Sequence, residues 1–358
     1  MTYLFFVQGE GRGHMTQALT LKGKLESRGH KILAVVVGTD KKTEIPSFFQ
    51  EQINVPLFKV ESPNFVVDKK GQGIEIMASV IQTARRSPLY RKSLKSIKKI
   101  VKDFNPDILI NFYEPMAGSY YRLYRDKRPM FCLGHQYFVE HPSFRLSVKD
   151  RFLKYPIIFY NRLTAPRRGI KIALSFTAEK DIPTKKLFVC PPLLREIVKK
   201  QVPTRNDFLF IYLLNAGYSQ EVIKWSKLNP QAKIEAFWNK PGKEVTNFGA
   251  NLIFHRLNAE KFVNRLAACR AYAGTAGFES IAEAAYLQKD ILMIPTKGHS
   301  EQKCNALDAK RAGLAIMSEK FDLSLMADET KTHSPQTLAA FKKWVDGNDK
   351  KILKLLEG

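Results

Sequence analysis

Cysteine is scarce in this chain, and the spacing of its cysteines excludes two classes of site. The 358 residues contain four cysteines. No two of them have the short separation that is typical of zinc ligands or of a redox-active pair. We therefore expect buried, reduced thiols in a cytoplasmic protein. The four residues are Cys132, Cys190, Cys269 and Cys304.

Long apolar runs are also lacking. The sequence contains no run of about 18 apolar residues, so it predicts no membrane-spanning helix. The apolar residues 1–7 form a short segment without a basic region or a cleavage site, which indicates a buried first strand and not a signal peptide. We expect a cytoplasmic protein, with peripheral attachment to the inner face of the plasma membrane suggested by its charge.

Acidic residues are few relative to basic ones. The chain has 34 Asp and Glu against 58 Lys and Arg, a net charge of +24, which predicts a nucleic acid, a membrane surface or a charged substrate as partner. Residues 85–102 carry eight basic residues and no acid, and predict a basic amphipathic helix with Leu94, Ile97 and Val101 toward lipid. Residues 151–168 interleave aromatic and basic side chains. Each segment alone is more typical of an ordinary surface helix, but together they favour an anionic membrane face.

The common nucleotide-binding loops are absent. Residues 9–14 read Gly-Glu-Gly-Arg-Gly-His between a predicted strand and a predicted helix. The dinucleotide fingerprint requires Gly or Ala where His14 stands, and a P-loop requires Gly-Lys followed by Ser or Thr. This glycine loop therefore argues against both NAD and ATP.

The sequence does contain a regular alternation of apolar strands with helices. Such an alternation predicts parallel sheets with helices on both faces, and therefore an α/β fold of two Rossmann-like domains. Pro191 and Pro192 stiffen the chain at the expected crossing between domains. We predict an N-terminal domain of residues 1–192 and a C-terminal domain of residues 193–337, with a tail of residues 338–358 that packs back on the first.

Residues 274–306 form the most informative segment. They read as a loop with two glycines, a helix, a short apolar strand that stops at Pro295, and a second polar loop. A glycine loop that opens onto a helix leaves backbone N–H groups available for a phosphate. A generic βαβ unit without a ligand would give a similar pattern.

This segment and the first glycine loop resemble glycosyltransferases of the two-domain B-type fold, most closely family 28, which includes the bacterial peptidoglycan N-acetylglucosaminyltransferase. The resemblance implies that the two domains face each other across a cleft. It also implies that Ala276 and Gly277 hold the donor pyrophosphate and that Glu283 binds the ribose. Glu301 and Gln302, ahead of an Asn-Ala dipeptide, would contact the donor sugar. The chain departs from the family at residues 288–290, where Gln-Lys-Asp replaces Gly-x-Pro in a turn.

Further positions follow from the same resemblance. Gly13 would lie near the donor phosphates, Ser219 would add a phosphate contact, and the backbone at Leu257 would contact the base. Gln136, in a polar loop after a strand, would face the acceptor.

Two residues are candidate catalytic bases. His14 has a suitable intrinsic pKa and would face the cleft, although a histidine that only orders the loop fits the pattern too. Glu114, which follows a predicted strand, is the second candidate.

These observations predict an inverting glycosyltransferase that moves a hexose or N-acetylhexosamine from a UDP-sugar to a hydroxyl acceptor, a lipid or a lipid-linked glycan. Asp-x-Asp, which holds a metal ion in the other large glycosyltransferase fold, does not occur. We therefore expect no cofactor and no metal requirement, with a helix N-terminus stabilising the leaving group. A UDP-sugar 2-epimerase of the same fold is an alternative. So is a non-enzymatic nucleic-acid-binding protein, which is disfavoured because no reader motif is found.

Overall fold

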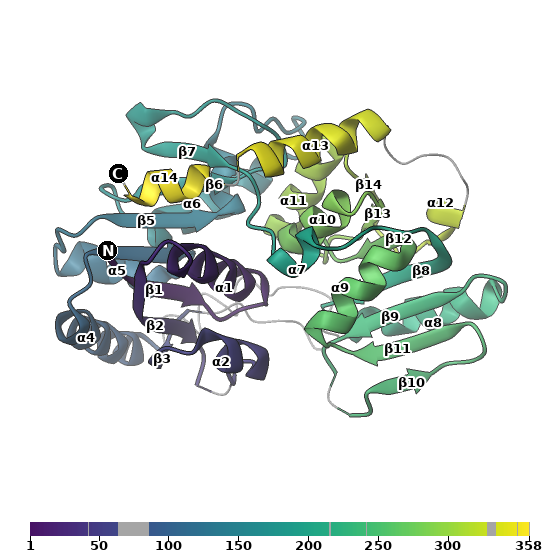
Figure 1. Ribbon diagram of the computed structural model, residues 1–358, viewed down its shortest axis with the longest axis horizontal. Coiled ribbons are helices and arrows are strands. Elements are labelled where there is room, and N and C mark those ends of the chain that lie inside the picture. Colours follow the sequence, from purple (N-terminus) through teal and green to yellow (C-terminus); the bar gives the residue numbers. More distant parts are fainter. Residues whose placement is uncertain are drawn as a thin grey trace. The chain divides into compact units, whose positions relative to one another are not determined.

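The computed structural model describes residues 1–41, 43–63, 86–214, 216–240, 242–327, 334–348 and 350–357. Arg85, the first residue of the basic segment 85–102, lies outside this range. The described chain divides into two compact units (Figure 1). The N-terminal unit contains residues 1–63, 86–193 and 347–357, and the C-terminal unit contains residues 194–346.

The N-terminal unit is built on a seven-stranded parallel sheet with the strand order β3-β2-β1-β4-β5-β6-β7. In register, Phe5 of β1 lies between Val35 of β2 and Ile110 of β4. Except for the edge strand β3, the strands are apolar and mostly buried, as expected for a parallel sheet that is covered on both faces. The strands are β1 (Thr2–Gln8), β2 (Lys31–Thr39), β3 (Leu57–Glu61), β4 (Ile108–Phe112), β5 (Met130–Gly134), β6 (Ile170–Leu174) and β7 (Leu187–Cys190).

Helices cover both faces of this sheet. The chain moves outward from β1 through α1 to β2, and returns from β3 through α4 to β4. Because such crossovers are right-handed, the two helices lie on opposite faces. The helices are α1 (Gly13–Glu26), α2 (Ser47–Ile53), α4 (Ser87–Phe104), α5 (Pro115–Leu123), α6 (Lys154–Thr164) and α14 (Lys351–Glu357), with the 3-10 turns η1 (His135–Glu140), η2 (Arg151–Leu153) and η3 (Pro183–Lys185).

The predicted basic helix exists as α4, but its orientation differs from the prediction. Ile97 and Val101 are 0% and 1% exposed and Leu94 is half-buried, because this side of α4 packs against β3 and α5. The opposite side presents the lysines to solvent. The expectation that Leu94, Ile97 and Val101 face lipid is therefore wrong, since the core of the unit already covers them.

The C-terminal unit has a second seven-stranded sheet, with the order β10-β11-β9-β8-β12-β13-β14. All pairs are parallel except β10 with β11 at one edge. Its strands are β8 (Asn206–Leu213), β9 (Ile234–Trp238), β10 (Val245–Asn247), β11 (Leu252–Arg256), β12 (Cys269–Gly274), β13 (Asp290–Met293) and β14 (Ile316–Met317). Its helices are α7 (Glu196–Lys199), α8 (Ser219–Leu228) after the turn η4 (Ala216–Tyr218), α9 (Ala259–Ala268), α10 (Phe278–Tyr286), α11 (Ser300–Arg311), α12 (Ser324–Ala327) and α13 (Pro335–Gly347).

The C-terminal segment is shared between the units. On α13, Asp346 accepts a hydrogen bond of 2.9 Å from the Tyr286 hydroxyl of α10, and both residues belong to the C-terminal unit. The following helix α14 belongs to the N-terminal unit, where Arg28 at the end of α1 donates to Glu357 at 2.6 Å. The change of unit near the prolines falls between Leu193 and Leu194.

The cysteines are all buried and unbridged. Burial raises the pKa of Cys132, Cys190 and Cys269 to about 12, so these thiols stay protonated and unreactive. Within the described ranges, the structure contains no helix that is both long and apolar enough to span a bilayer.

Candidate active site

The strand order of each sheet locates the place where a ligand can bind. In the N-terminal unit the chain order reverses between β1 and β4, and in the C-terminal unit it reverses between β8 and β12. Loops that leave the carboxyl ends of such neighbouring strands diverge, which opens a crevice for a ligand. The loop after β1 carries Gly13 and His14, and the loop after β12 carries Ala276 and Gly277. These four predicted residues therefore lie at the switch points of their units.

His14 lies in the first turn of α1, and the side chains of two glutamines hold its ring in place. Its Nδ1 lies 3.2 Å from Oε1 of Gln17, and its Nε2 lies 3.4 Å from Nε2 of Gln136. Because the carbonyl oxygen of Gln17 can only accept, Nδ1 carries the proton. The Gln136 amide then donates to the lone pair of Nε2. The structure thus joins His14 with Gln136, which was predicted on the acceptor side.

Burial determines the protonation state of His14. Burial lowers the pKa of His14 to about 4, and the hydrogen bond to Gln17 opposes this shift only partly. The imidazole is therefore neutral near pH 7, and its Nε2 lone pair accepts from the Gln136 amide in this structure.

Tyr113 directly follows β4, the neighbour of β1 in the sheet, and its ring packs against His14. The two rings stack with their centroids 5.6 Å apart, and the Tyr113 hydroxyl donates to Asn161 at 2.8 Å. Tyr113 has a φ of 62°, in the left-handed region that bulky residues rarely adopt. The asparagine Asn111 fixes this turn by bonding both backbone groups of Glu114. A strained tyrosine at a switch point is a functional candidate that the sequence did not reveal.

Glu114 is completely enclosed. One of its oxygens, Oε1, accepts hydrogen bonds from the Ser62 hydroxyl at 2.6 Å and from the Met116 backbone at 2.9 Å. The other, Oε2, accepts none from the described residues and fills the space where a Cβ on Gly38 would lie, 2.0 Å away. Burial raises the pKa of Glu114 to about 7 against the effect of these two bonds. Because Glu114 is 0% exposed, its carboxyl group is not open to an acceptor, and His14 is the better-placed candidate base.

In the C-terminal unit, the loop between β12 and α10 presents a helix N-terminus. Gly277 is the N-cap of α10, and its own position offers no side-chain cap because glycine has no side chain. The Asn305 side chain donates to the Ala276 carbonyl at 3.0 Å, which ties the loop to α11. The backbone N–H groups at the start of α10 thus form a rigid site of positive potential that suits a phosphate.

Glycine occupies positions 274 and 277 for different physical reasons. A Cβ on Gly274 would come within 2.5 Å of the Tyr272 hydroxyl, so the protein itself demands glycine there. A Cβ on Gly277 would meet the Ser280 hydroxyl at 3.5 Å and the Thr275 carbonyl at 4.0 Å, both ordinary contact distances. Glycine at 277 is therefore not required by packing, which is consistent with a ligand that approaches the backbone at this point.

Glu283 forms an ion pair that the sequence did not predict. Its two oxygens accept hydrogen bonds of 2.6 and 2.7 Å from Nε and Nη2 of Arg195. Both side chains belong to the C-terminal unit, and the carboxylate of Glu283 is almost fully buried. Such a two-point contact fixes the carboxylate in one orientation, and each oxygen keeps a lone pair for a further donor. Only the fold brings together residues that are 88 positions apart.

The predicted sugar-contacting residues lie in the first turn of α11. The side-chain oxygen of Gln302 accepts from the Thr296 backbone at 2.8 Å and so holds the loop after β13, while Glu301 is half-buried beside it. His299 is the N-cap of α11, and burial lowers its pKa to about 4. His299 and Asn305 thus hold the segment in place.

The remaining predicted contacts follow neighbouring strands of the same sheet. Ser219 is the first residue of α8 after β8, and Leu257 directly follows β11. The Leu257 N–H donates to the Trp238 carbonyl at 3.2 Å, which leaves the Leu257 carbonyl as its backbone contact for a base. Because β8, β11, β12 and β13 run parallel, these residues share one edge of the sheet with Gly277 and Gln302.

The departure at residues 288–290 falls in a turn, as expected. Gln288 has a φ of 58°, the left-handed conformation that glycine adopts at no steric cost. Lys289 is buried and donates to the carbonyl groups of Thr204 and Cys269, in the latter case at 3.0 Å. Among the residues that the structure describes, no three His, Cys, Asp or Glu side chains are grouped so as to hold a metal ion.

Known proteins share this architecture over nearly its whole length. The chain is 22% identical to an uncharacterized glycosyltransferase of Methanosarcina mazei over 340 residues, which cover 88% of this chain and 85% of that protein. Arabidopsis thaliana UGT89C1 complexed with UDP-L-rhamnose matches with a TM-score of 0.62 and 14% identity, covering 99% of this chain and 97% of that one. MurG of Acinetobacter baumannii matches with a TM-score of 0.57 and 13% identity, covering 99% of both chains.

The structural matches establish the fold, and a family model establishes the class of protein. The predicted fold of two Rossmann-like domains of the B type is confirmed by these solved structures. The family model that matches is described as glycosyl transferase family 1, and it covers residues 1–331. The chain therefore belongs to glycosyl transferase family 1 and is a glycosyltransferase of the B-type fold.

Proposed function

We propose that this protein is an inverting, metal-independent glycosyltransferase that moves a hexose or N-acetylhexosamine from a UDP-sugar to a hydroxyl acceptor. The observation that carries the proposal is the switch point of the C-terminal unit, where Gly277 opens α10 and Arg195 fixes Glu283. The similarity to a protein that was solved with UDP-L-rhamnose supports a nucleotide-sugar donor.

In this proposal the C-terminal unit binds the donor. Backbone groups at Ala276 and Gly277, with the Ser219 hydroxyl, bind the pyrophosphate at the helix N-termini. Glu283 accepts hydrogen bonds from the ribose hydroxyls, and the Leu257 carbonyl accepts from the base. Glu301 and Gln302 bind hydroxyls of the sugar. The positive end of α10 stabilises the charge that develops on the leaving UDP, so no metal is required.

The N-terminal unit holds the acceptor and the base. Gln136 binds the acceptor hydroxyl beside Nε2 of His14, with Gly13 forming the adjacent backbone. As the acceptor oxygen forms its bond to the anomeric carbon, the bond from that carbon to the UDP oxygen breaks. The acceptor proton passes to Nε2 of His14, and attack on the side opposite UDP inverts the configuration.

The charge of the chain supports an acceptor at an anionic surface. With 58 basic against 34 acidic residues, the protein is attracted to anionic phospholipid. We propose a lipid or lipid-linked glycan as acceptor, and a cytoplasmic enzyme that attaches peripherally to the inner face of the plasma membrane.

A thermal-shift panel tests the donor. UDP and UDP-hexoses should raise the melting temperature more than dTDP, GDP or ADP, and EDTA should not change this shift. UDP release in the presence of an acceptor, equal with and without EDTA, would support metal-independent transfer. A protein that ignores all nucleotides, or that needs a divalent cation for UDP release, contradicts the proposal.

A further inference from the structure

A stripe of aromatic side chains on the N-terminal unit is exposed to solvent and does not pack on the core. Phe152, Tyr155 and Phe159 are 61%, 62% and 64% exposed. They occupy positions i, i+3 and i+7 of η2 and α6, which run into each other and place these residues on one side. Val148, in the preceding loop, is also exposed. Such a contiguous set of large apolar side chains marks an interaction surface.

The rest of α6 is firmly anchored. Ile157, Asn161 and Thr164 are buried on the side that faces the unit. The Asn161 side chain donates to the Gln136 carbonyl at 3.0 Å and to Glu140 at 2.9 Å. The stripe is therefore presented by a fixed helix, and its exposure does not come from fraying.

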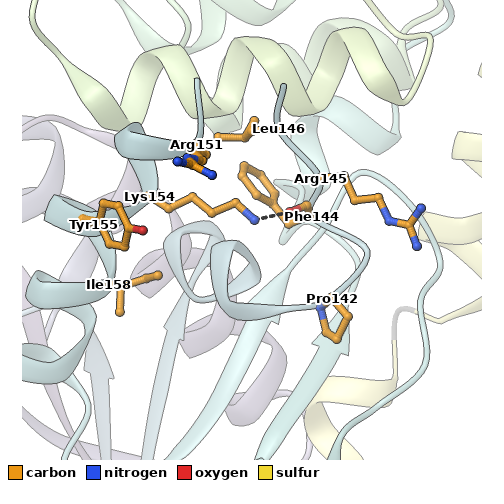
Figure 2. A pocket seen from close by; sticks show the side chains of 8 residues that line it. All are labelled: Pro142, Phe144, Arg145, Leu146, Arg151, Lys154, Tyr155 and Ile158. Carbon is orange, nitrogen blue, oxygen red and sulfur yellow. Dashed lines mark hydrogen bonds between the residues drawn. The ribbon is translucent and has the colours of Figure 1, made fainter. Parts of the chain in front are cut away.

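A basic pocket lies next to the stripe. It has a volume of 420 Å³, and its lining includes Arg145, Arg151, Lys154 and Tyr155. Figure 2 shows Lys154 reaching to the carbonyl of Phe144, with Arg151 and Tyr155 on one side and Arg145 on the other. The Lys154 ammonium also lies 4.9 Å from the centre of the Phe144 ring. The pocket thus combines three cations with apolar walls.

Few negative charges balance these cations. Residues 141–168 contain seven Lys and Arg and a single acid, Asp150, which accepts a hydrogen bond of 2.6 Å from Ser147. Within the part of the chain that the structure describes, neither Arg145 nor Arg151 pairs with a carboxylate. The local charge therefore fits an anion, and the adjacent stripe fits an apolar phase.

We infer that the η2–α6 face, defined as Val148, Phe152, Tyr155 and Phe159 with Arg145, Arg151 and Lys154, docks on a bilayer that contains anionic phospholipid. The three cations bind lipid phosphate, and the aromatic side chains enter the boundary between headgroups and acyl chains. Unlike a protein partner, a fluid bilayer needs no complementary shape to receive apolar side chains that project from a helix. This inference rests on the membrane acceptor of the proposed function and deepens it, because it assigns the attachment to particular residues.

Flotation with vesicles tests the cations. The protein should bind phosphatidylcholine vesicles that contain phosphatidylglycerol, and should bind pure phosphatidylcholine weakly. Arg145→Gln with Arg151→Gln should weaken binding about 30-fold, at roughly fivefold per cation. The matched control is Lys95→Gln with Lys99→Gln on the exposed side of α4, which removes the same charge elsewhere. If both pairs weaken binding equally, net charge and not this face determines binding, and the inference falls.

A second measurement tests insertion of the aromatic stripe. In a Phe159→Trp variant, brominated acyl chains should quench the added fluorescence. Phe152→Ser with Tyr155→Ser and Phe159→Ser should abolish the part of the binding that survives high salt. An absence of quenching, or a soluble polyanion that competes fully with the vesicles, would overturn the bilayer as partner.

Donor binding separates this inference from the proposed function. The UDP response in thermal shift should be unchanged in every one of these variants, because the proposed donor residues belong to the C-terminal unit. If the wild-type protein binds anionic vesicles through this face but does not bind nucleotides, the docking surface is supported and the proposed donor is contradicted. If it binds UDP but not the vesicles, the donor is supported and the docking surface is contradicted.

Discussion

The two switch points of this molecule have the same topology but opposite chemistry. In the N-terminal unit, His14 and Glu114 follow β1 and β4, and burial favours the neutral form of both: the pKa of His14 falls to about 4 and that of Glu114 rises to about 7. In the C-terminal unit, Glu283 forms a two-point ion pair with Arg195 and lies on α10, the helix whose N-cap is Gly277. A desolvated neutral imidazole suits proton transfer, whereas paired charges and backbone N–H groups suit an anionic ligand.

This contrast shows how one fold can divide a reaction. The parallel sheet only determines where loops diverge. The loop sequence decides whether the site transfers a proton or binds a phosphate. The following predictions test whether the division holds, in order of decreasing effect.

The largest effect is expected from removing the imidazole. His14→Ala should lower turnover by about 10²–10⁴-fold while UDP affinity stays the same, because a general base acts on the acceptor and not on the donor. Steady-state kinetics and UDP titration measure the two quantities. His30→Ala is a matched control near the amino end of β2, and should leave both unchanged. Equal loss of UDP affinity and turnover in His14→Ala would make His14 a residue that orders the loop.

The buried carboxyl group should produce a pH-dependent stability. Because the pKa of Glu114 is raised from 4.5 to about 7, its stabilising contribution is present below about pH 4.5 and is lost as the pH rises through 7. Glu114→Gln removes this loss, so the variant should gain about 2–4 kcal/mol relative to wild type between about pH 5 and pH 8.

Urea unfolding at the two pH values measures the gain. Glu51→Gln, at an exposed position of α2, serves as the control and should change stability by less than about 0.5 kcal/mol. If the difference between wild type and Glu114→Gln does not vary with pH, the carboxyl group is not held neutral by burial.

Glu283 tests the charged site. Glu283→Gln keeps an oxygen for Arg195 but removes the charge-assisted bond to a ribose hydroxyl, so UDP should bind with about 1.5–3 kcal/mol less free energy. Calorimetric titration measures this change. Glu279→Gln, in the first turn of the same helix, is the control and should cost about 0.3–1 kcal/mol or less. Unchanged UDP affinity in a folded Glu283→Gln variant would contradict the ribose assignment.

The smallest effect is expected at the glycine of the helix N-terminus. Gly277→Ala should fold, since its methyl group meets Ser280 and Thr275 at ordinary contact distances. UDP affinity should nevertheless fall about tenfold, or about 1.4 kcal/mol, because the methyl group occupies the approach of the phosphate. In the control, Gly23→Ala, the methyl group meets nothing within 4 Å on α1. That change should raise stability by about 0.5–1 kcal/mol without altering UDP affinity. Equal UDP binding in both variants would contradict the proposal that this loop binds the donor phosphate.

The sequence by itself determined the class of fold and the placement of the two glycine loops. Continuous apolar strands that alternate with helices can be buried only in parallel sheets covered on both faces, and glycines between a strand and a helix mark where backbone can meet a ligand. These patterns are local, so the residues on either side of His14 and Gly277 are enough to identify both positions.

Only the tertiary structure decided which side chains meet. The apolar side of α4 is buried while the aromatic stripe of α6 is exposed, although both segments read as basic helices. The partnership of Arg195 with Glu283 likewise depends on residues distant in sequence. Burial and long-range contacts set orientation and pKa, and neither has a local signature in the chain.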